Sequence, residues 1–337
     1  MKTALVTGIT GQDGAYLAQL LLDKNYKVFG GIRRTSQDAY SRLRFLKIES
    51  KIEYLNFDLT DPYCVFDLIK KYKFDEIYNL AAQSFVGASW SLPHQTTQVN
   101  SVGVLNILDA IKKESPSTKF YQASTSEMFG EVQEPIQTEN TPFYPRSPYG
   151  VSKLFSHWIT VNYRESYDLH LNSGILFNHE SPLRGEEFVT KKIVRQLVEV
   201  QEGKRDTLQL GNLNAKRDWG FAKEYVLAMW LMLQQDKPDD FVIATGKTTS
   251  VREFVQFTAE ALDFDIEWEG VNENEKGYDK RSGKLVVEVM PKFYRPAEVN
   301  LLIGSAAKAK KILDWEAKTS VKKLVDIMVD SQKKQKR

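Results

Sequence analysis

Short apolar runs and amphipathic stretches alternate along the first part of the chain. Residues 4–6 and 27–32 are short apolar or glycine-containing runs of the kind that forms buried parallel strands. Between them, residues 15–22 place Leu17, Leu20 and Leu21 at helical spacing. The pattern predicts a strand, a helix and a second, parallel strand, in the order of a βαβ unit.

The same alternation continues to residue 176. Strands are expected at residues 52–56, 76–80, 119–123 and 171–176, and helices at residues 61–72, 99–111 and 149–163. Strands that alternate with helices indicate a parallel sheet with helices on both faces. We therefore predict an α/β fold with a Rossmann-type, doubly wound parallel sheet.

The regular alternation is lost after residue 177. Helices are expected at residues 191–202 and 251–261, a strand at 241–245, a surface loop at 269–283 and an exposed strand at 284–289. Val321, Leu324, Val325 and Met328 follow helical spacing and predict a final amphipathic helix. We predict a nucleotide-binding domain over residues 1–177, to which a segment near 218–246 returns. A smaller, interleaved α/β domain, mainly residues 178–337, is expected to bind the substrate.

The composition excludes several classes of protein. Of the 337 residues, 42% are hydrophobic, which is enough for a large core. The 46 lysines and arginines nearly balance the 44 aspartates and glutamates, so the net charge of +2 offers no field for nucleic acid or an anionic membrane. The single cysteine, Cys64, permits no internal disulfide and no cysteine metal cluster. No run approaches the ~18 apolar residues of a membrane span and we find no signal peptide, so we expect a cytoplasmic protein without a metal.

Three glycines lie between the first expected strand and the first expected helix. Residues 7–14 read TGITGQDG, with glycine at positions 8, 11 and 14. Glycine lets the backbone turn sharply and approach a pyrophosphate, to which the helix N-terminus offers free N–H groups. The position between strand and helix predicts a dinucleotide-binding turn. The expected cofactor contacts in this turn are Gly8, Thr10, Gly11, Gln12, Asp13 and Gly14.

The second strand ends in residues that favour NADP over NAD. A site that prefers NAD places a carboxylate here, against the ribose 2′-hydroxyl. This chain has Arg33 and Arg34, followed by Thr35 and Ser36, and a guanidinium suits a 2′-phosphate through paired, charge-assisted hydrogen bonds. The later strands add expected contacts to the adenine from Asp58 and Leu59, and to the ribose and nicotinamide from Leu80, Ala81, Ala82, Gln83 and Ser84.

Tyr149 and Lys153 lie four residues apart on an expected helix, so their side chains share one face. An ammonium beside a phenol lowers the pKa of the phenol, and the positive nicotinamide ring of an oxidised cofactor acts in the same direction. A tyrosinate formed in this way can remove a proton from a sugar hydroxyl while hydride leaves the same carbon. The pair therefore predicts the catalytic base of a hydride-transfer enzyme.

A second polar group, STSE at residues 124–127, follows the expected strand at 119–123. It therefore lies at the carboxyl edge of the sheet, where open α/β folds bind ligands. A hydroxyl there can polarise a carbonyl oxygen, and Glu127 adds a carboxylate for a second proton transfer. Once C4 of a hexose is a ketone, the C5 proton is acidic, and a carboxylate can remove it while the C6 hydroxyl leaves as water.

These motifs together resemble the extended short-chain dehydrogenase/reductases and, more closely, the GDP-mannose 4,6-dehydratase family. The matching stretches run in order through nearly the whole chain: TGITGQDG at residues 7–14, QASTSE at 122–127, PRSPYGVSK at 145–153, FNHESPLRG at 177–185, GNLNAKRDWG at 211–220 and YRPAEV at 294–299. The glutamine–aspartate form of the glycine turn and the STSE run are far more specific than the general motifs.

The resemblance implies conversion of GDP-mannose to GDP-4-dehydro-6-deoxy-D-mannose, with NADP taking hydride from C4 and returning it to C6. Tyr149 would be the base at the C4 hydroxyl, Thr125 and Lys153 would assist it, and Glu127 would act in the elimination. The cofactor contacts that it implies are Gln95, Tyr149, Lys153, His179 and Arg184. The substrate contacts that it implies are Ser84, Asn178, Lys192, Arg217, Arg295 and Glu298. It also implies a homo-oligomer, either a dimer or a tetramer.

Other functions stay open at this point. A 4,6-dehydratase that acts on a related GDP-sugar, such as a GDP-manno-heptose, needs the same residues. An NADP-dependent reductase or epimerase of sugar nucleotides needs only the hydride-transfer residues, and Glu127 argues against it because such relatives usually lack a carboxylate there. A non-catalytic NADP-binding scaffold has no need of Thr125, Tyr149 and Lys153.

Overall fold

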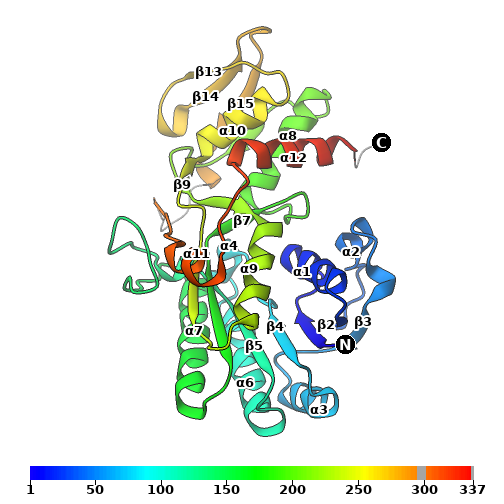
Figure 1. Cartoon of the computed structure of the whole chain (residues 1–337). Coiled ribbons are helices and arrows are strands. Elements are labelled where there is room, and N and C mark those ends of the chain that lie inside the picture. Colours follow the sequence, from blue (N-terminus) through cyan, green and yellow to red (C-terminus); the bar gives the residue numbers. More distant parts are fainter. Residues whose placement is uncertain (294–300, 335–337) are drawn as a thin grey trace.

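The computed structural model describes residues 1–293 and 301–334. Figure 1 shows a larger lobe, below, in which a sheet lies between layers of helices, and a smaller lobe above it. The N-terminus lies in the larger lobe, and the last described helix, α12 (Val321–Lys334), lies in the smaller one. We call the larger one the sheet lobe and the smaller one the upper lobe.

A seven-stranded sheet forms the centre of the sheet lobe. Its strands lie in the order β11-β6-β5-β4-β1-β2-β3, and every neighbouring pair is parallel. The strands are β1 (Thr3–Thr7), β2 (Lys27–Ile32), β3 (Glu53–Asn56), β4 (Glu76–Asn79), β5 (Lys119–Thr125), β6 (Leu171–Leu176) and β11 (Asp240–Ile243). The strand order reverses between β1 and β4, and open α/β sheets bind ligands at such a switch point. The predicted doubly wound α/β fold is confirmed.

Helices cover both faces of this sheet. The long ones are α1 (Gln12–Asp23) and α9 (Ala222–Gln234) on one face, and α3 (Pro62–Tyr72), α6 (Gly103–Glu114) and α7 (Pro148–Tyr167) on the other. Alternate residues of β1 account for the two cores, because Ala4 and Val6 pack with α1 and α9 whereas Leu5 packs with α3 and α6. Shorter helical pieces are α2 (Ser41–Phe45), η1 (Glu49–Lys51), α4 (Val86–Ser89), α5 (Pro93–Thr97), the π-helical η2 (Gln98–Val102) and η3 (Ser126–Met128).

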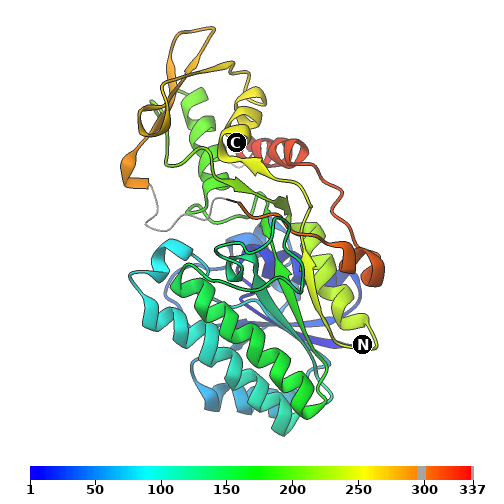
Figure 2. The same cartoon turned by 90° about the vertical axis from the view of Figure 1, so that its left-hand side faces the viewer.

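The upper lobe gathers later segments around a second core. Helices α8 (Val189–Gln201), α10 (Val251–Glu260) and α12 pack together and against a small sheet of order β13-β14-β15-β8. Its strands are β13 (Ile266–Glu269), β14 (Lys276–Asp279), β15 (Leu285–Val289) and β8 (Leu208–Leu210). In Figure 2 the orange part of this sheet projects at the end of the lobe farthest from the seven-stranded sheet.

Two predictions for the upper lobe are wrong. Residues 276–279 form β14, where the high content of charge and glycine predicted a surface loop. The strand predicted as exposed, β15, is buried, with Val286 and Val287 at 0% exposure. It pairs on one side with β14 and on the other with β8, and its apolar side chains enter the core formed with α8, α10 and α12.

The chain passes back and forth between the lobes. It leaves β6 through β7 (Asn178–Glu180), which pairs with β10 (Trp219–Phe221), and returns to the sheet lobe in α9 and β11. It leaves again through β12 (Thr249–Ser250), which pairs with β9 (Lys216–Arg217), and α11 (Ala307–Leu313) then packs on α9 and β11. The returning segment near 218–246 covers α9 and β11, and the division of the chain at residue 177 stays a prediction.

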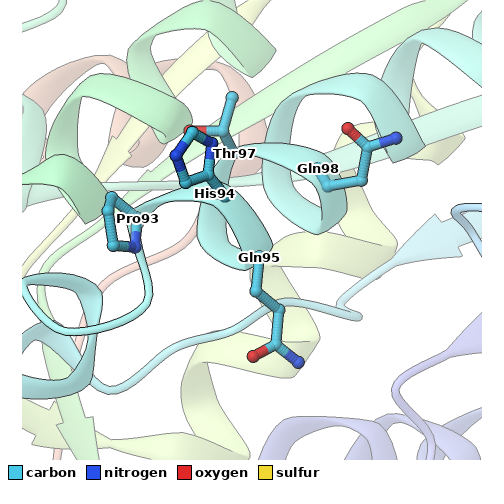
Figure 3. Close-up of a pocket in the computed structure, with 5 residues that line it drawn as sticks. All are labelled: Pro93, His94, Gln95, Thr97 and Gln98. Atoms are coloured by element: carbon cyan, nitrogen blue, oxygen red, sulfur yellow. The ribbon is translucent and has the colours of Figure 1, made fainter.

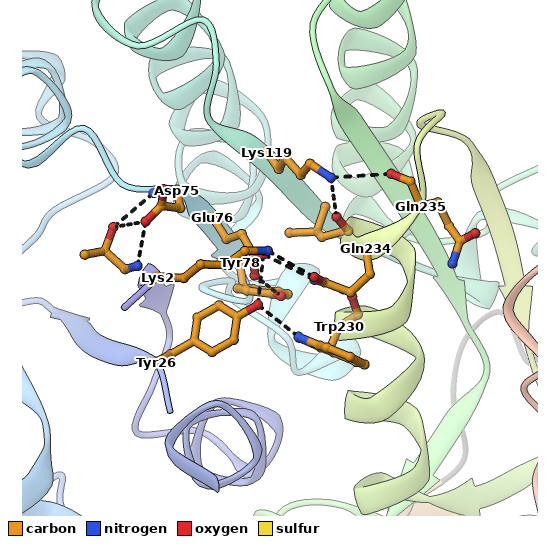
Figure 4. Close-up of polar contacts among 11 residues, drawn as sticks. Lys2, Tyr26, Asp75, Glu76, Tyr78, Lys119, Trp230, Gln234 and Gln235 are labelled. Atoms are coloured by element: carbon orange, nitrogen blue, oxygen red, sulfur yellow. Dashed lines mark hydrogen bonds and ion pairs between the residues drawn. The ribbon is translucent and has the colours of Figure 1, made fainter. Parts of the chain in front are cut away.

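A buried carboxylate joins the strands at the amino-terminal edge of the sheet (Figure 4). Glu76 in β4 is 1% exposed and accepts hydrogen bonds from Lys2 Nζ at 3.0 Å, Tyr26 Oη at 3.0 Å, Tyr78 Oη at 2.7 Å and Gln234 Nε2 at 3.2 Å. A buried carboxylate is tolerated only when its oxygens are paired in this way. The contacts fasten α9 and the start of β1 to β4, at the edge opposite the switch point.

Candidate active site

The end of β5 and the first turn of α7 bring predicted catalytic residues to the carboxyl edge of the sheet. Thr125 is the last residue of β5, and its Oγ1 accepts a hydrogen bond from the N–H of Glu127, 3.2 Å away. Helix α7 begins at Pro148, because the Ser147 side chain accepts a hydrogen bond from an N–H of the first turn and proline suits the first helical position. Tyr149 follows directly in this first turn.

Tyr149 is a buried phenol, 8% exposed, at the centre of this group. Burial raises its pKa well above the ordinary value, while a hydrogen bond with the Thr125 side chain lowers it; the negative charge of Glu127 raises it again, and the positive charge of Arg184 opposes that rise. Tyr149 therefore hydrogen-bonds with Thr125 and is influenced by the charge of Glu127. The expected fall in the pKa of Tyr149 is not found for the chain alone, because loss of solvent around the phenol outweighs the nearby positive charge.

Lys153 lies one turn further along α7 and is 4% exposed. Its Nζ donates a hydrogen bond to the carbonyl oxygen of Ala123 at 2.9 Å and lies 6.0 Å from the centre of the Tyr149 ring. Burial lowers the pKa of Lys153 to about 8, because the ammonium has lost most of its contact with water. The side chain therefore still carries its charge at neutral pH.

The turn between β1 and α1 closes tightly around two glycines. Gly8 has a φ of +65°, and a Cβ there would lie 2.8 Å from the backbone of Leu80 and Ala81. A Cβ at Gly14 would lie 2.4 Å from the carbonyl oxygen of Gly8, so neither position accepts a side chain. Thr7 Oγ1 accepts hydrogen bonds from the N–H groups of Leu80 at 3.1 Å and Ala81 at 3.2 Å. The N-terminus of α1, with Gly11 as its cap, thus opens at the switch point between β1 and β4.

Two polar residues of the same turn contact the second half of the chain. Asp13 Oδ2 lies 2.8 Å from His179 Nε2. Gln12 Nε2 donates to the carbonyl oxygen of His179 at 3.1 Å, and Gln12 Oε1 accepts from the Ser181 hydroxyl at 2.6 Å. Burial raises the pKa of Asp13, but the charge and hydrogen bond of His179 outweigh it and leave the pKa below its ordinary value. Burial lowers the pKa of His179, and Asp13 reverses this, so the two form an ion pair.

The residues expected at the adenosine end of a cofactor lie around the ends of β2 and β3. Those that follow β2 are all exposed: Arg33, Arg34, Thr35 and Ser36. Asp58 follows β3, and its Oδ1 accepts hydrogen bonds from the N–H and the hydroxyl of Thr60. Leu59 is buried, and a Cβ at Gly103 of α6 would lie 2.8 Å from its side chain.

Asn100 positions the loop after β4, a role that was not predicted from the sequence. It is 1% exposed in η2, accepts a hydrogen bond from the N–H of Gln83 at 2.9 Å and donates to the carbonyl oxygen of Gln83 at 3.1 Å. It also donates to the Ser152 hydroxyl of α7 at 3.1 Å. Within the same loop Ala82 is half-buried and Ser84 is exposed. A polar residue inside the predicted helix 99–111 was the only signal for this role.

Lys192 belongs to a group of positive charges in the upper lobe. Burial, followed by the charges of Lys292, Arg195 and Arg205, lowers the pKa of Lys192 to about 8. Its Nζ lies 3.6 Å from the centre of the Phe293 ring. Arg195 and Arg205 are already paired with carboxylates, those of Glu186 and Glu199. A cation whose pKa is lowered by neighbouring positive charges is stabilised by an anion placed beside it, so Lys192 could hold a phosphate-bearing ligand.

The remaining predicted contacts of the second half are distributed around β7 and β9. Asn178 begins β7 and is partly buried, and Arg217 in β9 is 8% exposed with its Nη1 donating to the carbonyl oxygen of Lys216 at 2.9 Å. Arg184 Nε lies 3.0 Å from the Glu180 carboxylate. Two predicted substrate contacts lie outside the described residues: Arg295 and Glu298.

Gln95 is exposed on α5, at a shallow pocket with a volume of about 540 Å³. Figure 3 shows its amide extending away from His94 and Thr97. The lining residues are Pro93, His94, Gln95, Thr97 and Gln98, all of them exposed. Gln95 therefore stands on a different element from Thr125 and Tyr149.

Neither a metal site nor a membrane span is found in residues 1–293 and 301–334. No three His, Cys, Asp or Glu side chains in these ranges lie close enough together to hold a metal ion. No helix there is long and apolar enough to cross a membrane.

Solved structures share the fold at low sequence identity. The dTDP-glucose 4,6-dehydratase of Bacillus anthracis, in complex with NAD, has a TM-score of 0.82 at 21% identity and covers 100% of this chain and 98% of its own. RMD of Pseudomonas aeruginosa, complexed with NADPH, has a TM-score of 0.78 at 20% identity and covers 99% of this chain and 100% of its own. The two neighbours carry different cofactors, so the shared fold does not discriminate between NAD and NADP.

Comparisons of sequence are more specific. A family model described as GDP-mannose 4,6 dehydratase matches residues 5–328. The GDP-mannose 4,6 dehydratase of Dictyostelium discoideum is 50% identical over 337 residues, which cover 97% of this chain and 95% of the relative. The human protein of the same name is 52% identical over 336 residues, which cover 97% of this chain and 90% of the relative. The match extends over both lobes, and the chain therefore belongs to the GDP-mannose 4,6-dehydratase family.

Proposed function

We propose that this protein converts GDP-D-mannose to GDP-4-dehydro-6-deoxy-D-mannose and uses NADP as a cofactor that is regenerated in each turnover. The observation that carries the proposal is the electrostatic setting of Tyr149, whose phenol hydrogen-bonds with the Thr125 side chain and is influenced by the negative charge of Glu127. A reductase or epimerase needs the phenol and the hydroxyl alone. The carboxylate supplies the further base that elimination of water requires. Relatives about half identical over nearly the whole chain bear the name of this activity.

The turn after β1 fits the pyrophosphate of a dinucleotide. Gly8 and Gly14 bring backbone close to the N-terminus of α1, whose free N–H groups suit an anion. We propose NADP in preference to NAD because the exposed guanidinium groups of Arg33 and Arg34 stand at the end of β2, where a 2′-phosphate would meet them. When bound, NADP⁺ accepts hydride from C4 of the sugar and supplies it again at C6.

Tyr149 acts first, as the base at the C4 hydroxyl. The Thr125 hydroxyl, which contacts the phenol, can hydrogen-bond the same sugar oxygen and hold it in line. Positive charge must lower the pKa of Tyr149 before it can take this proton, since burial alone raises it. The buried ammonium of Lys153, on the same face of α7, supplies part of that charge.

Glu127 acts second, at C5. Oxidation at C4 makes the C5 proton acidic, and the carboxylate removes it while the C6 oxygen leaves with a proton as water. Tyr149, which holds the proton from the C4 hydroxyl, can provide the proton of that water. The proton held by Glu127 returns to C5 when C6 is reduced, so both residues finish the cycle in their starting ionisation states.

The upper lobe is proposed to hold the substrate's diphosphate. The positive charge of Lys292 lowers the pKa of Lys192, and a diphosphate beside the two would relieve this repulsion. Arg217, Asn178 and Ser84 are proposed as further contacts. This arrangement leaves the sugar to extend toward the carboxyl edge of the seven-stranded sheet, where Thr125 and Tyr149 lie.

We also propose that copies of the chain associate as a dimer or tetramer. Val151, Phe155 and Trp158 follow one face of α7 and are 56%, 43% and 55% exposed. Their spacing gives an apolar stripe on the outside of the sheet lobe, and stripes of this kind support association. The cytoplasmic location stays a prediction from the sequence.

The experiment that tests the function follows the sugar by NMR. Purified protein is incubated with GDP-mannose and a catalytic amount of NADP⁺, without added reductant. The proposal expects a 4-keto-6-deoxy sugar to accumulate. Failure with GDP-mannose together with turnover of a GDP-heptose would show that the substrate is a GDP-heptose. Accumulation of a 4-epimer would show that the protein is an epimerase and not a dehydratase.

A further inference from the structure

Three side chains fasten the nucleotide turn, residues 10–13, to residues 179–183, the entry segment that leads from β7 toward α8. The first is Asp13, paired with His179, and the second is Gln12, which contacts both His179 and Ser181. The third is Arg42 of α2, whose Nε donates to the carbonyl oxygen of Leu183 at 2.7 Å and whose Nη1 donates to that of Thr10 at 3.1 Å.

His179 occupies the centre of these contacts, and protein atoms occupy both of its ring nitrogens. Nδ1 lies 2.7 Å from the carbonyl oxygen of Phe177, which can only accept, so Nδ1 carries a proton. Nε2 faces the Asp13 carboxylate. The ring also stacks on Tyr225, with centroids 4.6 Å apart and planes at 22°. A side chain held on three sides in this way fixes the backbone of the entry segment. It has no ring nitrogen left for a ligand.

The Asp13 carboxylate stands at the N-terminus of α1, where the proposed cofactor would place its pyrophosphate. An unpaired carboxylate there would repel that anion. The Asp13 pKa lies below its ordinary value and the His179 pKa above, so the pair carries opposite charges that cancel. Pairing with His179 therefore removes the repulsion and joins the two lobes at the same time.

We propose that Asp13, His179 and Arg42 form a positioning clamp that sets the cofactor turn against the substrate lobe, so that the nicotinamide and the sugar stay in register through both hydride transfers. The inference rests on the proposed function. Hydride transfer tolerates little misplacement, and a shift of about 1 Å lowers a rate by about 100-fold. The glutamine–aspartate form of the glycine turn is then explained by contacts with the entry segment.

The test separates binding from turnover in variants of Asp13. Asp13→Ala breaks the clamp, and we expect kcat to fall by about 100-fold while the Kd for NADP⁺, measured by fluorescence quenching, stays within about threefold. Asp13→Asn keeps a hydrogen bond to the ring through a neutral pair, so it should recover most of the lost kcat. A fall in NADP⁺ affinity as large as the fall in kcat of Asp13→Ala would show that Asp13 is a cofactor ligand and would overturn the proposal.

His179→Ala should affect NADP⁺ binding, whereas Asp13→Ala should not. It leaves the carboxylate unpaired, so it should weaken NADP⁺ binding, and adding Asp13→Asn should restore the affinity. Additive losses in the double variant would contradict the clamp, because independent contacts add and shared ones do not. Asp240→Asn is the matched control: it breaks another partly buried ion pair, with Arg164, and should leave kcat and NADP⁺ affinity unchanged.

The binding measurements also separate this proposal from the function on which it rests. If the unaltered chain bound NADP⁺ but turned over no GDP-mannose, the proposed substrate would be wrong, and the affinity pattern of the Asp13 and His179 variants would still decide the charge pairing. If the variants turned over GDP-mannose with the kcat and KM of the unaltered chain, the clamp would be wrong and the function would stand.

Discussion

The ammonium of Lys153 donates a hydrogen bond to the carbonyl oxygen of Ala123 across 2.9 Å. Ala123 lies two residues before Thr125 in β5, so this bond ties the helix that carries Tyr149 to the strand that carries Thr125. The bond also keeps a charge in a place where burial lowers its pKa to about 8. The buried charge therefore lowers the free energy of unfolding.

Replacing Lys153 with methionine should abolish most activity with little loss of stability. At pH 7 the buried charge costs about 3 kcal/mol. The lost hydrogen bond from the ammonium contributes about 1.5–3 kcal/mol, although the Ala123 carbonyl oxygen keeps the Gln122 amide as a donor at 3.0 Å, so the two effects nearly offset. We expect kcat to fall by at least about 100-fold while Tm changes by only a few degrees.

The pH dependence of stability checks the same residue. Between pH 8 and the ordinary pKa of 10.5, the unfolded chain binds a proton at Lys153 that the folded chain has released, so stability rises with pH in this window. Urea unfolding should therefore show the unaltered chain gaining stability relative to Lys153→Met from pH 8 to 10. Parallel curves for the two proteins would contradict the lowered pKa.

Glu127→Gln should separate oxidation from elimination. The amide keeps the shape of the side chain but cannot take the C5 proton, so the enzyme should oxidise C4 and then stop. We expect the absorbance of the reduced cofactor to accumulate on the protein while no 6-deoxy sugar appears by NMR. Exchange of the C5 proton with deuterated solvent should also be lost. Full dehydratase activity in this variant would remove Glu127 from the mechanism.

Arg33→Ala and Arg34→Ala should each weaken NADP⁺ binding more than NAD⁺ binding. A hydrogen bond between charged groups contributes about 1.5–3 kcal/mol, which corresponds to a loss of affinity of about 10-fold to 100-fold. The effect should shrink at high salt, because both arginines are exposed. Lys51→Ala, which removes an exposed positive charge near β3, is the control. Equal losses for NADP⁺ and NAD⁺ would argue against a 2′-phosphate contact.

Glu76→Ala should destabilise the fold without touching the chemistry. It leaves the buried Tyr78 hydroxyl without its acceptor and removes one of the two acceptors of the Gln234 amide, so we expect a loss of about 3–5 kcal/mol in urea unfolding. Lys2→Met removes a partner that is half exposed and should cost about 1 kcal/mol or less. NADP⁺ affinity should be unchanged in both variants, because Glu76 lies at the opposite edge of the sheet. Equal stabilities for the two variants would contradict this account.

His170 should make the protein less stable in mild acid. Burial, with the charge of Lys119, lowers its pKa to about 4, so between pH 6.5 and 4 the unfolded chain takes up a proton that the folded chain does not. Stability therefore falls as pH falls through this window. Urea unfolding of His170→Phe should show a smaller loss between pH 7 and 5, whereas the exposed control His94→Asn should follow the unaltered chain. Identical losses for all three proteins would count against this assignment.

The sequence predicts the seven-stranded sheet well because short apolar runs and amphipathic stretches alternate there. The short runs indicate buried strands, and the amphipathic stretches indicate helices. Helix α9 escapes prediction for a physical reason. It is apolar on several faces, because Leu227, which is 36% exposed, and the partly buried Trp230 add to the buried Met229, so no periodicity separates it from a buried strand. Strand β14 escapes because glycine and charged residues interrupt its alternation.

Some parts of the candidate site can likewise be predicted from the sequence, and others cannot. Tyr149, Lys153 and the glycine turn follow from local spacing, because helix and turn geometry fix their neighbours. The pairing of Asp13 with His179 joins residues 166 positions apart, and nothing local announces it. The charge that Lys292 adds beside Lys192 also arises only when two distant segments meet in the upper lobe.

The repeated passage of the chain between its two lobes constrains how such a protein can change over generations. The upper lobe is assembled from segments separated in the gene by α9, β11 and α11, which belong to the sheet lobe. A single exchange of coding sequence cannot transfer one lobe to another protein intact. Exchange of a single continuous segment that spans the upper lobe would carry α9, β11 and α11 of the sheet lobe along with it.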